Sequence, residues 1–237
     1  GGTFRLLEYP GAALLADETS LLVQSIADSQ TQPDDNAINA LTNAFFLLPR
    51  YIEYVLTRQS ELPILVIPAV NELRLVAKQP LLPEHHFSFV DIPASISTTP
   101  APVGKNEVGE LLTSIGRLRH MYQTGLLGII KQQAPGPHYY RLMFRSMSRI
   151  ASMLRGHDNQ LDWRLAAAVI ECFARGSLSL TINRKRNLAS VEKMLRQVVN
   201  KGEEGLDEPI PETLKKEFLF LLLLSGFESP EVNILLD

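Results

Sequence analysis

The sequence predicts an all-α fold, a helical bundle made of two packed helical subdomains. Apolar residues recur at spacings of three and four along most of the chain, which is typical of helices with one buried side. Residues that favour helix ends stand where these patterns begin and stop. Alternating strand patterns are nearly absent, and residues 177–182 (SLSLTI) are the one candidate.

Two apolar patterns of helical period lie in the first half of the chain. The first consists of Ile38, Leu41, Phe45, Leu48, Ile52 and Val55. Asp34 or Asp35 can cap its helix by accepting from the N–H groups of the first turn. The second consists of Val66, Val70, Leu73 and Ala77. Pro63 suits the first turn of that helix, whereas Pro68 falls inside the pattern and should bend it.

Three further apolar patterns lie in the second half of the chain, and we expect each to form the buried side of a helix. Their members are Val108, Leu111, Ile115, Leu118 and Tyr122; then Met143, Met147, Ile150 and Leu154; then Leu165, Val169 and Cys172. Gly176 and Gly226 stand where helices end in the left-handed conformation that favours glycine.

A proline-rich stretch divides the chain. Pro80, Pro83, Pro93, Pro100 and Pro102 interrupt helical patterning, together with a Ser/Thr cluster. We expect an N-terminal helical subdomain at residues 1–80, a connection at 81–105 and a C-terminal helical subdomain at 106–237. Three or four helices should precede the connection, and five or six should follow it.

The composition fits a globular protein rather than a disordered chain or a membrane-spanning one. Apolar residues make up 45% of the 237 residues and charged residues 21%, with a net charge of -3. The longest apolar run, residues 218–224, is far shorter than the ~20 residues that span a bilayer. The single cysteine, Cys172, fits a reducing compartment and is expected to be a small buried hydrophobe. Because the chain starts at Gly1 without a Met and residues 231–237 read as an interrupted helix, we expect it to be part of a longer protein.

Charge is distributed unevenly along the chain. Residues 1–105 have a net charge of -5, residues 106–200 of +8 and residues 201–237 of -6. Arginine supplies 11 of the 14 basic residues in the middle segment, and arginine suits bidentate recognition of carboxylates or phosphates. The candidate partner-binding residues are Arg141, Arg145 and Arg149, which repeat every fourth residue opposite the Met143 pattern, and then Arg184, Lys185 and Arg186.

Three interpretations of these arginines remain open at this stage. They can pair internally with acidic residues such as Glu203, Glu204, Asp207 and Glu208, or bind an acidic protein partner, or bind nucleic acid. Tyr139, Tyr140 and Phe144 lie among the arginines, as base-stacking side chains do, but no known nucleic-acid motif accompanies them.

The sequence contains none of the common catalytic motifs, and we expect neither enzymatic activity nor a cofactor. A phosphate-binding glycine loop, a nucleophile elbow and an H-E-x-x-H pair are missing. His85 and His86 are adjacent, without a spaced third ligand, so no metal site is expected there. Trp163 is expected in the core.

His120 is the one residue that suggests chemistry. We expect the polar side of one helix to contain Thr113, Arg117, His120 and Thr124. The reactive histidine of a phosphotransfer domain is likewise exposed partway along a bundle helix. Such domains place a lysine three residues after the histidine, followed by a glycine. Here the third residue is neutral Gln123, and the glycine comes one position late, at Gly125. An active phosphotransfer protein is therefore an alternative function, and we expect His120 to be inactive.

Residues 47–83 (LLPRYIEYVLTRQSELPILVIPAVNELRLVAKQPLLP) and 117–130 (RLRHMYQTGLLGII) resemble the N-terminal region of the FimL family of type IV pilus scaffold proteins. A similar region opens the chemotaxis-like sensor kinase of pilus systems, in a segment that looks like a phosphotransfer domain without its histidine motif. The first stretch is specific because it keeps two prolines inside helical patterning.

This resemblance implies a degenerate phosphotransfer-like helical bundle that acts as a cytoplasmic scaffold at the cell pole. Its expected partners are a response regulator and a polar hub protein, and its expected effect is to promote cyclic-AMP-dependent twitching motility. The resemblance gives no binding residues, so the two arginine clusters rest on the local sequence alone.

Overall fold

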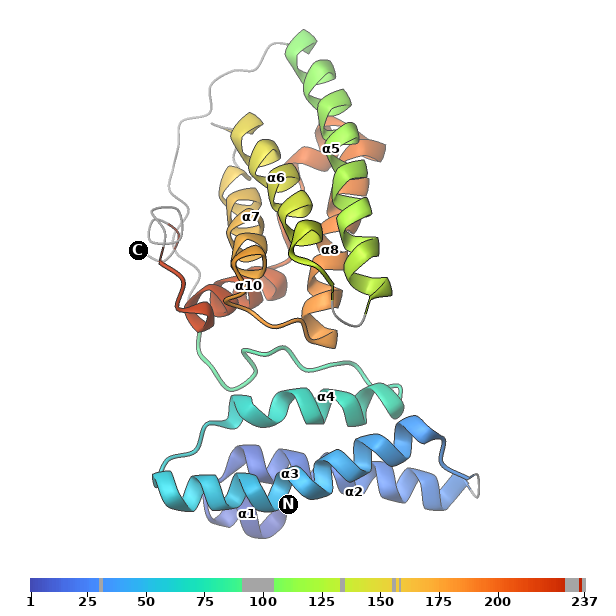
Figure 1. Ribbon diagram of the computed structural model, residues 1–237, viewed down its shortest axis with the longest axis vertical. Helices are drawn as coiled ribbons and strands as arrows, with labels where there is room; N and C mark the ends of the chain where they lie inside the picture. Colours follow the sequence, from blue (N-terminus) through green and yellow to red (C-terminus); the bar gives the residue numbers. More distant parts are fainter. Residues whose placement is uncertain are drawn as a thin grey trace. The chain divides into compact units, whose positions relative to one another are not determined.

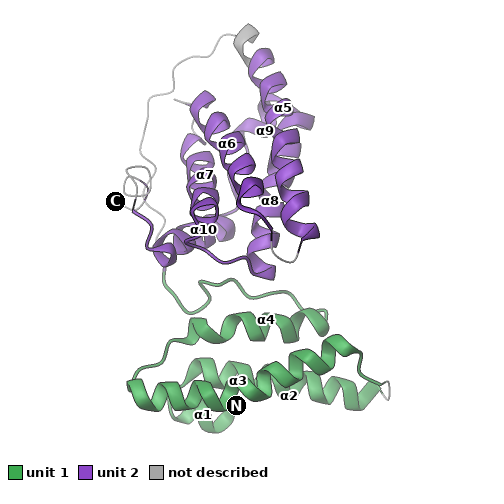
Figure 2. Ribbon diagram, viewed as in Figure 1, with its two compact units in different colours: residues 1–89 green, residues 90–237 purple. Residues whose placement is uncertain are grey.

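The protein is all-α in the computed structural model, as the sequence predicts. The structure describes residues 1–29, 32–90, 105–132, 135–154, 157, 159–228 and 235. Within these residues the chain forms ten α-helices and one 3-10 helix and contains no strand (Figure 1). No helix among them is long and apolar enough to cross a membrane. The chain separates into unit 1, Gly1–Phe89, and unit 2, Val90–Asp237 (Figure 2).

Unit 1 is built from five helical segments. These are α1 (Gly2–Leu6), α2 (Pro10–Ser29), α3 (Asp35–Arg58), the 3-10 helix η1 (Pro63–Val66) and α4 (Ile67–Val76). The expected cap of α3 is confirmed, because Ala37 N donates to Oδ1 of Asp34 at 2.8 Å. Pro68 does not bend a helix as predicted, since a 3-10 turn ends at Val66 and Pro68 lies in the first turn of α4. N–H groups in the first turn have no acceptor within the helix, so the missing N–H of proline costs no hydrogen bond there.

The buried side of α3 differs from the predicted one. Ala37, Ala40, Ala44, Tyr51 and Val55 are buried there. The predicted side includes Val55, but Ile38 is 48% exposed and Phe45 61% exposed, so these two core assignments are wrong. Large and small apolar residues both recur with helical period in this segment. The structure buries the alanine side, whose small side chains allow close packing in the core of unit 1.

A buried asparagine fixes the chain just after α4. Asn71 is 5% exposed, its Nδ2 donates to the carbonyl of Leu82 at 2.9 Å, and its Oδ1 accepts from Leu82 N at 2.8 Å. Arg74 Nε also donates to the carbonyl of Pro80 at 2.6 Å. These bonds hold residues 80–82 against helix α4. Residues 91–104 of the expected connection lie outside the described residues.

The described residues of unit 2 form six helices, and the sequence predicts five or six after the connection. They are α5 (Lys105–Lys131), α6 (Pro137–Met153), α7 (Gln160–Arg175), α8 (Ile182–Lys201), α9 (Glu203–Asp207) and α10 (Glu212–Ser225). The three predicted apolar patterns supply its core. The side chains of Ile115, Tyr122, Met143, Met147, Ile150, Leu154, Leu165, Val169 and Cys172 are all buried, as is Trp163. The side chain of Val108 lies outside the described part of the chain.

Local signals at helix ends are partly confirmed in unit 2. Gly176 and Gly226 end α7 and α10 in the left-handed conformation, with φ of 81° and 56°. Residues 177–182 do not form the candidate strand. Thr181 instead caps α8, because its Oγ1 accepts from Arg184 N at 3.2 Å.

Buried polar contacts tie the helices of unit 2 together. The hydroxyl of Tyr122 donates to the carbonyl of Leu188 at 2.8 Å, and burial raises the Tyr122 pKa well above its ordinary value, so the group stays a neutral donor. Asp162 accepts from Ile210 N at 2.9 Å and pairs with Lys215 at 2.8 Å. Glu217 accepts from the side chain of Asn183 at 3.0 Å. Each contact joins two helices, except the bond to Ile210, which joins α7 to the segment between α9 and α10.

We expect Asn71→Ala to lower the local stability of unit 1. The variant removes the two hydrogen bonds between the Asn71 side chain and the backbone of Leu82, which costs roughly 1–3 kcal/mol. Hydrogen exchange of the α4 amides and of the amides of Leu81, Leu82 and Glu84 measures this free energy of opening. The matched control is Asn43→Ala, which removes one exposed bond to Glu72. Equal protection of these amides from hydrogen exchange in the two variants would contradict a stabilising role of the Asn71 side chain.

Candidate partner-binding surface

Helix α6 (Pro137–Met153) holds the first predicted arginine cluster. Pro137 begins the helix, where its fixed φ is favourable, and Met143, Met147 and Ile150 are fully buried on the inner side. Ser146 Oγ donates to the carbonyl of Leu118 on α5 at 2.6 Å. These contacts fix which side of α6 points inward.

Two glycines bring α5 unusually close to α6. A Cβ built at Gly128 would lie 2.2 Å from Cδ1 of Tyr139, and one at Gly125 would lie 2.5 Å from Cγ of Met143. Both distances are far below van der Waals contact, so a larger residue at either position would force α6 or its side chains to shift. The glycine that sequence reasoning compared with a phosphotransfer motif is therefore buried in helix packing.

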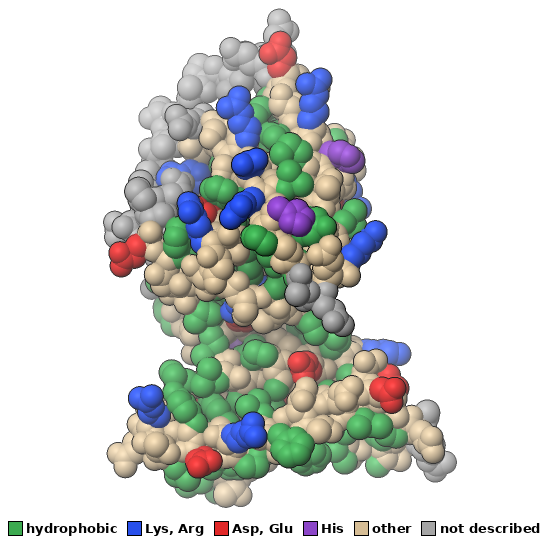
Figure 3. Space-filling model, in the orientation of Figure 1, with side chains coloured by type: hydrophobic (Ala, Val, Ile, Leu, Met, Phe, Trp, Pro, Cys, Tyr) green, Lys and Arg blue, Asp and Glu red, His purple; other side chains and the backbone are tan. Residues whose placement is uncertain are grey.

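The outer side of α6 carries three arginines. Arg141, Arg145 and Arg149 are exposed, and none takes part in an ion pair with a described residue. His138 is exposed on the same side, since it precedes Arg141 by three residues and Arg145 by seven. We call Arg141, Arg145, Arg149 and His138 the α6 basic face. In Figure 3, Lys and Arg side chains gather over this part of unit 2, with few acidic side chains between them.

The acidic residues that could have neutralised these arginines have other partners or lie exposed. Glu208 pairs with Lys201, and Asp207 lies 3.4 Å from Nε2 of His157. Glu203 and Glu204 are exposed on α9, and no ion pair joins them to the α6 arginines among the described side chains. Among the described residues, the three α6 arginines therefore form no internal ion pair, whereas Arg119, Arg175 and Arg196 of the same middle segment do.

The second predicted cluster does not form one surface. Arg184 is 7% exposed, and its Nη1 donates to the carbonyl of Ser179 at 2.8 Å. Lys185 is half-buried and Arg186 is exposed, so the three side chains point to different sides of α8. Sequence reasoning missed this because consecutive helical residues are about 100° apart and Arg184 anchors the start of α8.

A groove beside the α6 basic face was not predicted. It lies between α6 and α7, has a volume of about 490 Å³, and is lined by Phe144, Ser148, Ala151, Ser152, Gln160, Arg164, Ala167, Ala168 and Glu171. Most of these side chains are small, which leaves the space between the two helices open. The signal in the sequence is the run of alanines at 166–168 opposite Ser148 and Ser152.

The surroundings of His120 are used for packing between helices. His120 itself is exposed on α5, as expected. Gln123 Nε2 donates to Oε1 of Glu192 on α8 at 2.9 Å, and Arg119 Nη2 donates to the same oxygen at 2.7 Å. Gln123 therefore helps to hold α5 against α8 and brings no positive charge toward His120.

Groups suited to metal binding or nucleophilic chemistry do not gather in the described residues. No set of three or more His, Cys, Asp or Glu side chains could hold a metal ion there. His86 packs edge-on against Phe87, with ring centroids 4.8 Å apart. Cys172 is buried, and burial raises the pKa of its thiol, which leaves it less reactive than an exposed cysteine.

Two comparisons relate the chain to known proteins. Residues 107–237 match the model of the second domain of FimL scaffold proteins. The chain is also 37% identical, over 233 residues, to the scaffold protein FimL of Pseudomonas aeruginosa. That alignment covers 97% of this chain but 40% of the relative, so the chain spans about two fifths of the relative's length. No solved structure matches the chain.

We expect Arg145→Glu combined with Arg149→Glu to leave the stability of unit 2 nearly unchanged, within about 0.5 kcal/mol, because neither side chain has an internal partner. Arg119→Ala is the contrasting variant. It leaves the partly buried carboxylate of Glu192 without its main partner, at a cost of roughly 1–3 kcal/mol. Urea unfolding followed by the fluorescence of buried Trp163 measures both effects. A large loss of stability in the double variant would show that Arg145 and Arg149 stabilise the fold.

Proposed function

The chain belongs to the FimL scaffold protein family, and from this we propose that it is a scaffold module that binds protein partners without catalysing a reaction. We further propose that its partners are a response regulator of a type IV pilus chemosensory system and a polar hub protein. By joining the two at the cell pole, the scaffold would promote cyclic-AMP-dependent twitching motility. These partners and this role come from the family resemblance.

The observation that carries the proposal is the α6 basic face. Buried arginines are normally paired, and exposed ones often find a carboxylate nearby, yet three arginines in successive turns of α6 have no such partner in the described structure. Their guanidinium groups are therefore available for an acidic partner. The phosphorylation pocket of a receiver domain is ringed by acidic side chains, which makes a response regulator a suitable counterpart.

We propose that the response regulator docks on Arg141, Arg145 and Arg149. Arg186 and Lys185 form a secondary candidate on α8, and Arg184 is left out because its side chain is buried and bonded to Ser179. The groove between α6 and α7 borders the same face and can receive an apolar side chain of the partner. Charge pairs at the rim of such an interface mostly set association rate and salt sensitivity.

The alternative functions are less well supported. An active phosphotransfer protein would need a cation near His120, and Gln123 supplies none. A nucleic-acid-binding domain would use the same arginines, and its binding would weaken steeply as salt rises, in proportion to the phosphates contacted. Retention of a nucleic acid by the wild-type chain at physiological salt would favour that alternative.

We expect Arg145→Glu combined with Arg149→Glu to weaken binding of the response regulator's receiver domain by well over tenfold. Each reversal replaces an attraction with a repulsion, and tenfold corresponds to about 1.4 kcal/mol. Isothermal titration with the purified response regulator measures the affinity. The matched control is Arg50→Glu with Arg58→Glu, which changes the net charge equally at exposed arginines of α3. If both double variants bind equally well, the α6 basic face is not the docking site.

For His120, we expect no stable phosphoryl transfer from a phosphorylated receiver. Gln123 stands where the reactive motif has a lysine, and it is neutral and bonded to Glu192, so it does not neutralise the incoming charge. Incubation with labelled phospho-receiver, followed by acid and base treatment of the product, tests this. Label that appears in the wild type and disappears in His120→Ala would instead establish the phosphotransfer alternative.

A further inference from the structure

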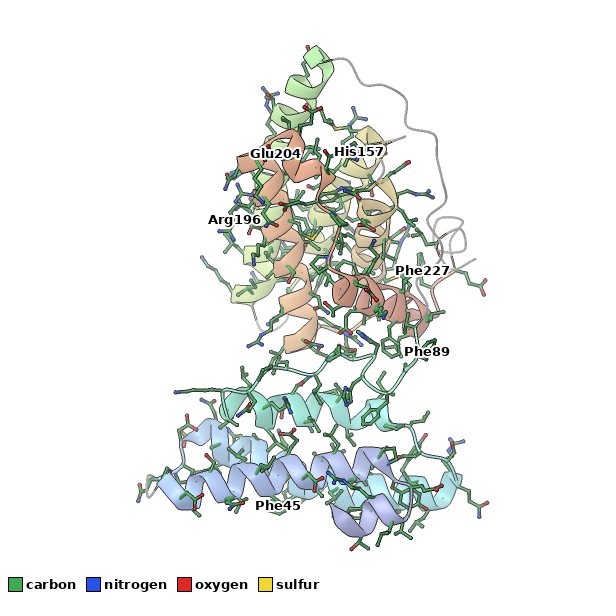
Figure 4. All side chains as sticks on the ribbon, turned by 180° about the vertical axis from the view of Figure 1, so that it is seen from behind. Phe45, Phe89, His157, Arg196, Glu204 and Phe227 are labelled. Atoms are coloured by element: carbon green, nitrogen blue, oxygen red, sulfur yellow. The ribbon has the colours of Figure 1, made fainter. Side chains whose placement is uncertain are left out.

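A second surface of unusual composition lies on α3 of unit 1. Its outer side exposes large apolar side chains, with Ile38 48%, Phe45 61%, Phe46 67% and Leu56 62% exposed. Ile38 and Leu56 are 18 positions apart, which is five full turns, so they lie on the same side about 27 Å from each other. Phe45 is labelled on this helix in Figure 4. We call this side, with Pro49 and Ile52, the α3 outer face.

The core of unit 1 does not need these side chains. The opposite side of α3 already supplies alanines, Tyr51 and Val55 to the packed core. A surface helix normally has polar residues opposite its buried side, and scattered single apolar residues there need no explanation. Here they form a continuous stripe along five turns, which is the pattern of a surface that binds another protein.

The α3 outer face has a shallow depression near its C-terminal end. Its volume is about 550 Å³, and it is lined by Pro49, Ile52, Glu53, Leu56 and Thr57. Pro49 has no N–H, so the carbonyl of Phe45 lacks the donor that the helical ladder would supply four residues later. That carbonyl, at the middle of the stripe, can accept a hydrogen bond from a side chain of a bound partner.

Two carboxylates lie along one edge of this face, and one arginine, Arg50, is exposed one turn from Glu53. Asp35 and Glu53 are also 18 positions apart and therefore share one edge of the stripe. Both are exposed, and neither forms an ion pair with a described residue. The whole of unit 1, residues 1–89, carries 5 basic and 10 acidic side chains. A second copy of the chain would bring the same acidic edge, so pairing of two α3 helices gains no compensating charge.

From these observations we propose that the α3 outer face binds an amphipathic helix whose apolar stripe is flanked by lysine or arginine. The apolar side chains of that helix would pack on Phe45, Ile52 and Leu56, and its basic residues would meet Asp35 and Glu53. This surface differs in charge and chemistry from the α6 basic face. The chain would then offer one docking site for an acidic partner and another for a basic one.

Two designed peptides of equal length test the proposal. Both carry leucines at helical spacings of three and four, and one has lysines beside the leucines where the other has glutamates. We expect saturable binding of the fluorescent lysine peptide to the full chain by anisotropy, and at least tenfold weaker binding of the glutamate peptide. Phe45→Gln combined with Leu56→Gln should weaken binding of the lysine peptide by at least tenfold. Glu53→Lys should weaken that binding severalfold.

The control replaces equally exposed leucines elsewhere. Leu21→Gln with Leu223→Gln changes side chains that are 61% and 59% exposed and should leave peptide affinity unchanged. Circular dichroism should show that all variants keep their helical content. Equal affinity for both peptides, or unchanged affinity in the Phe45/Leu56 variant, would overturn the proposal. A dimer in sedimentation that dissociates in that variant would assign the face to a second copy and overturn it as well.

Discussion

The contact between α5 and α6 determines most of what unit 2 presents to its surroundings. Gly128 and Gly125 let the backbone of α5 approach Tyr139 and Met143 so closely that no side chain fits between them. This contact, with the buried methionines of α6, sets the rotation of α6 about its own axis. The arginines that repeat every fourth residue are thereby turned outward as one face.

The exposure of those arginines also depends on where the carboxylates of unit 2 are used. Glu192 binds Arg119 and Gln123 between α5 and α8, and Asp162 binds Lys215 and the backbone of Ile210. Removing one partner from such a buried pair is costly, so these carboxylates are not available to α6. Part of the positive charge of the middle segment is therefore paired internally, as at Arg119, whereas Arg141, Arg145 and Arg149 remain on the surface of α6 without an ion pair among the described residues.

Much of the fold follows from the sequence because apolar period and helix ends are local properties. The Met143–Leu154 pattern, the Asp34 cap and the end of α7 at Gly176 needed no tertiary information. Other features depend on contacts that no local pattern contains. On α3 both the alanine side and the Phe45 side have helical period, and packing alone selects the smaller residues. The burial of Arg184 likewise depends on the turn that precedes α8. For the candidate site, residue spacing predicted the α6 stripe, whereas its lack of internal partners required the structure.

In the function we propose, the α6 basic face and the α3 outer face would give the scaffold two surfaces that prefer partners of opposite charge. The central claim is that an acidic receiver docks on α6, and amide chemical shifts measured during titration of the isotope-labelled chain with the response regulator test it most directly. We expect the largest chemical-shift changes at the amides of α6 between Arg141 and Arg149 and at the facing residues of α7. Shifts concentrated on α3, or on α8 around Arg186, with α6 unchanged, would contradict it.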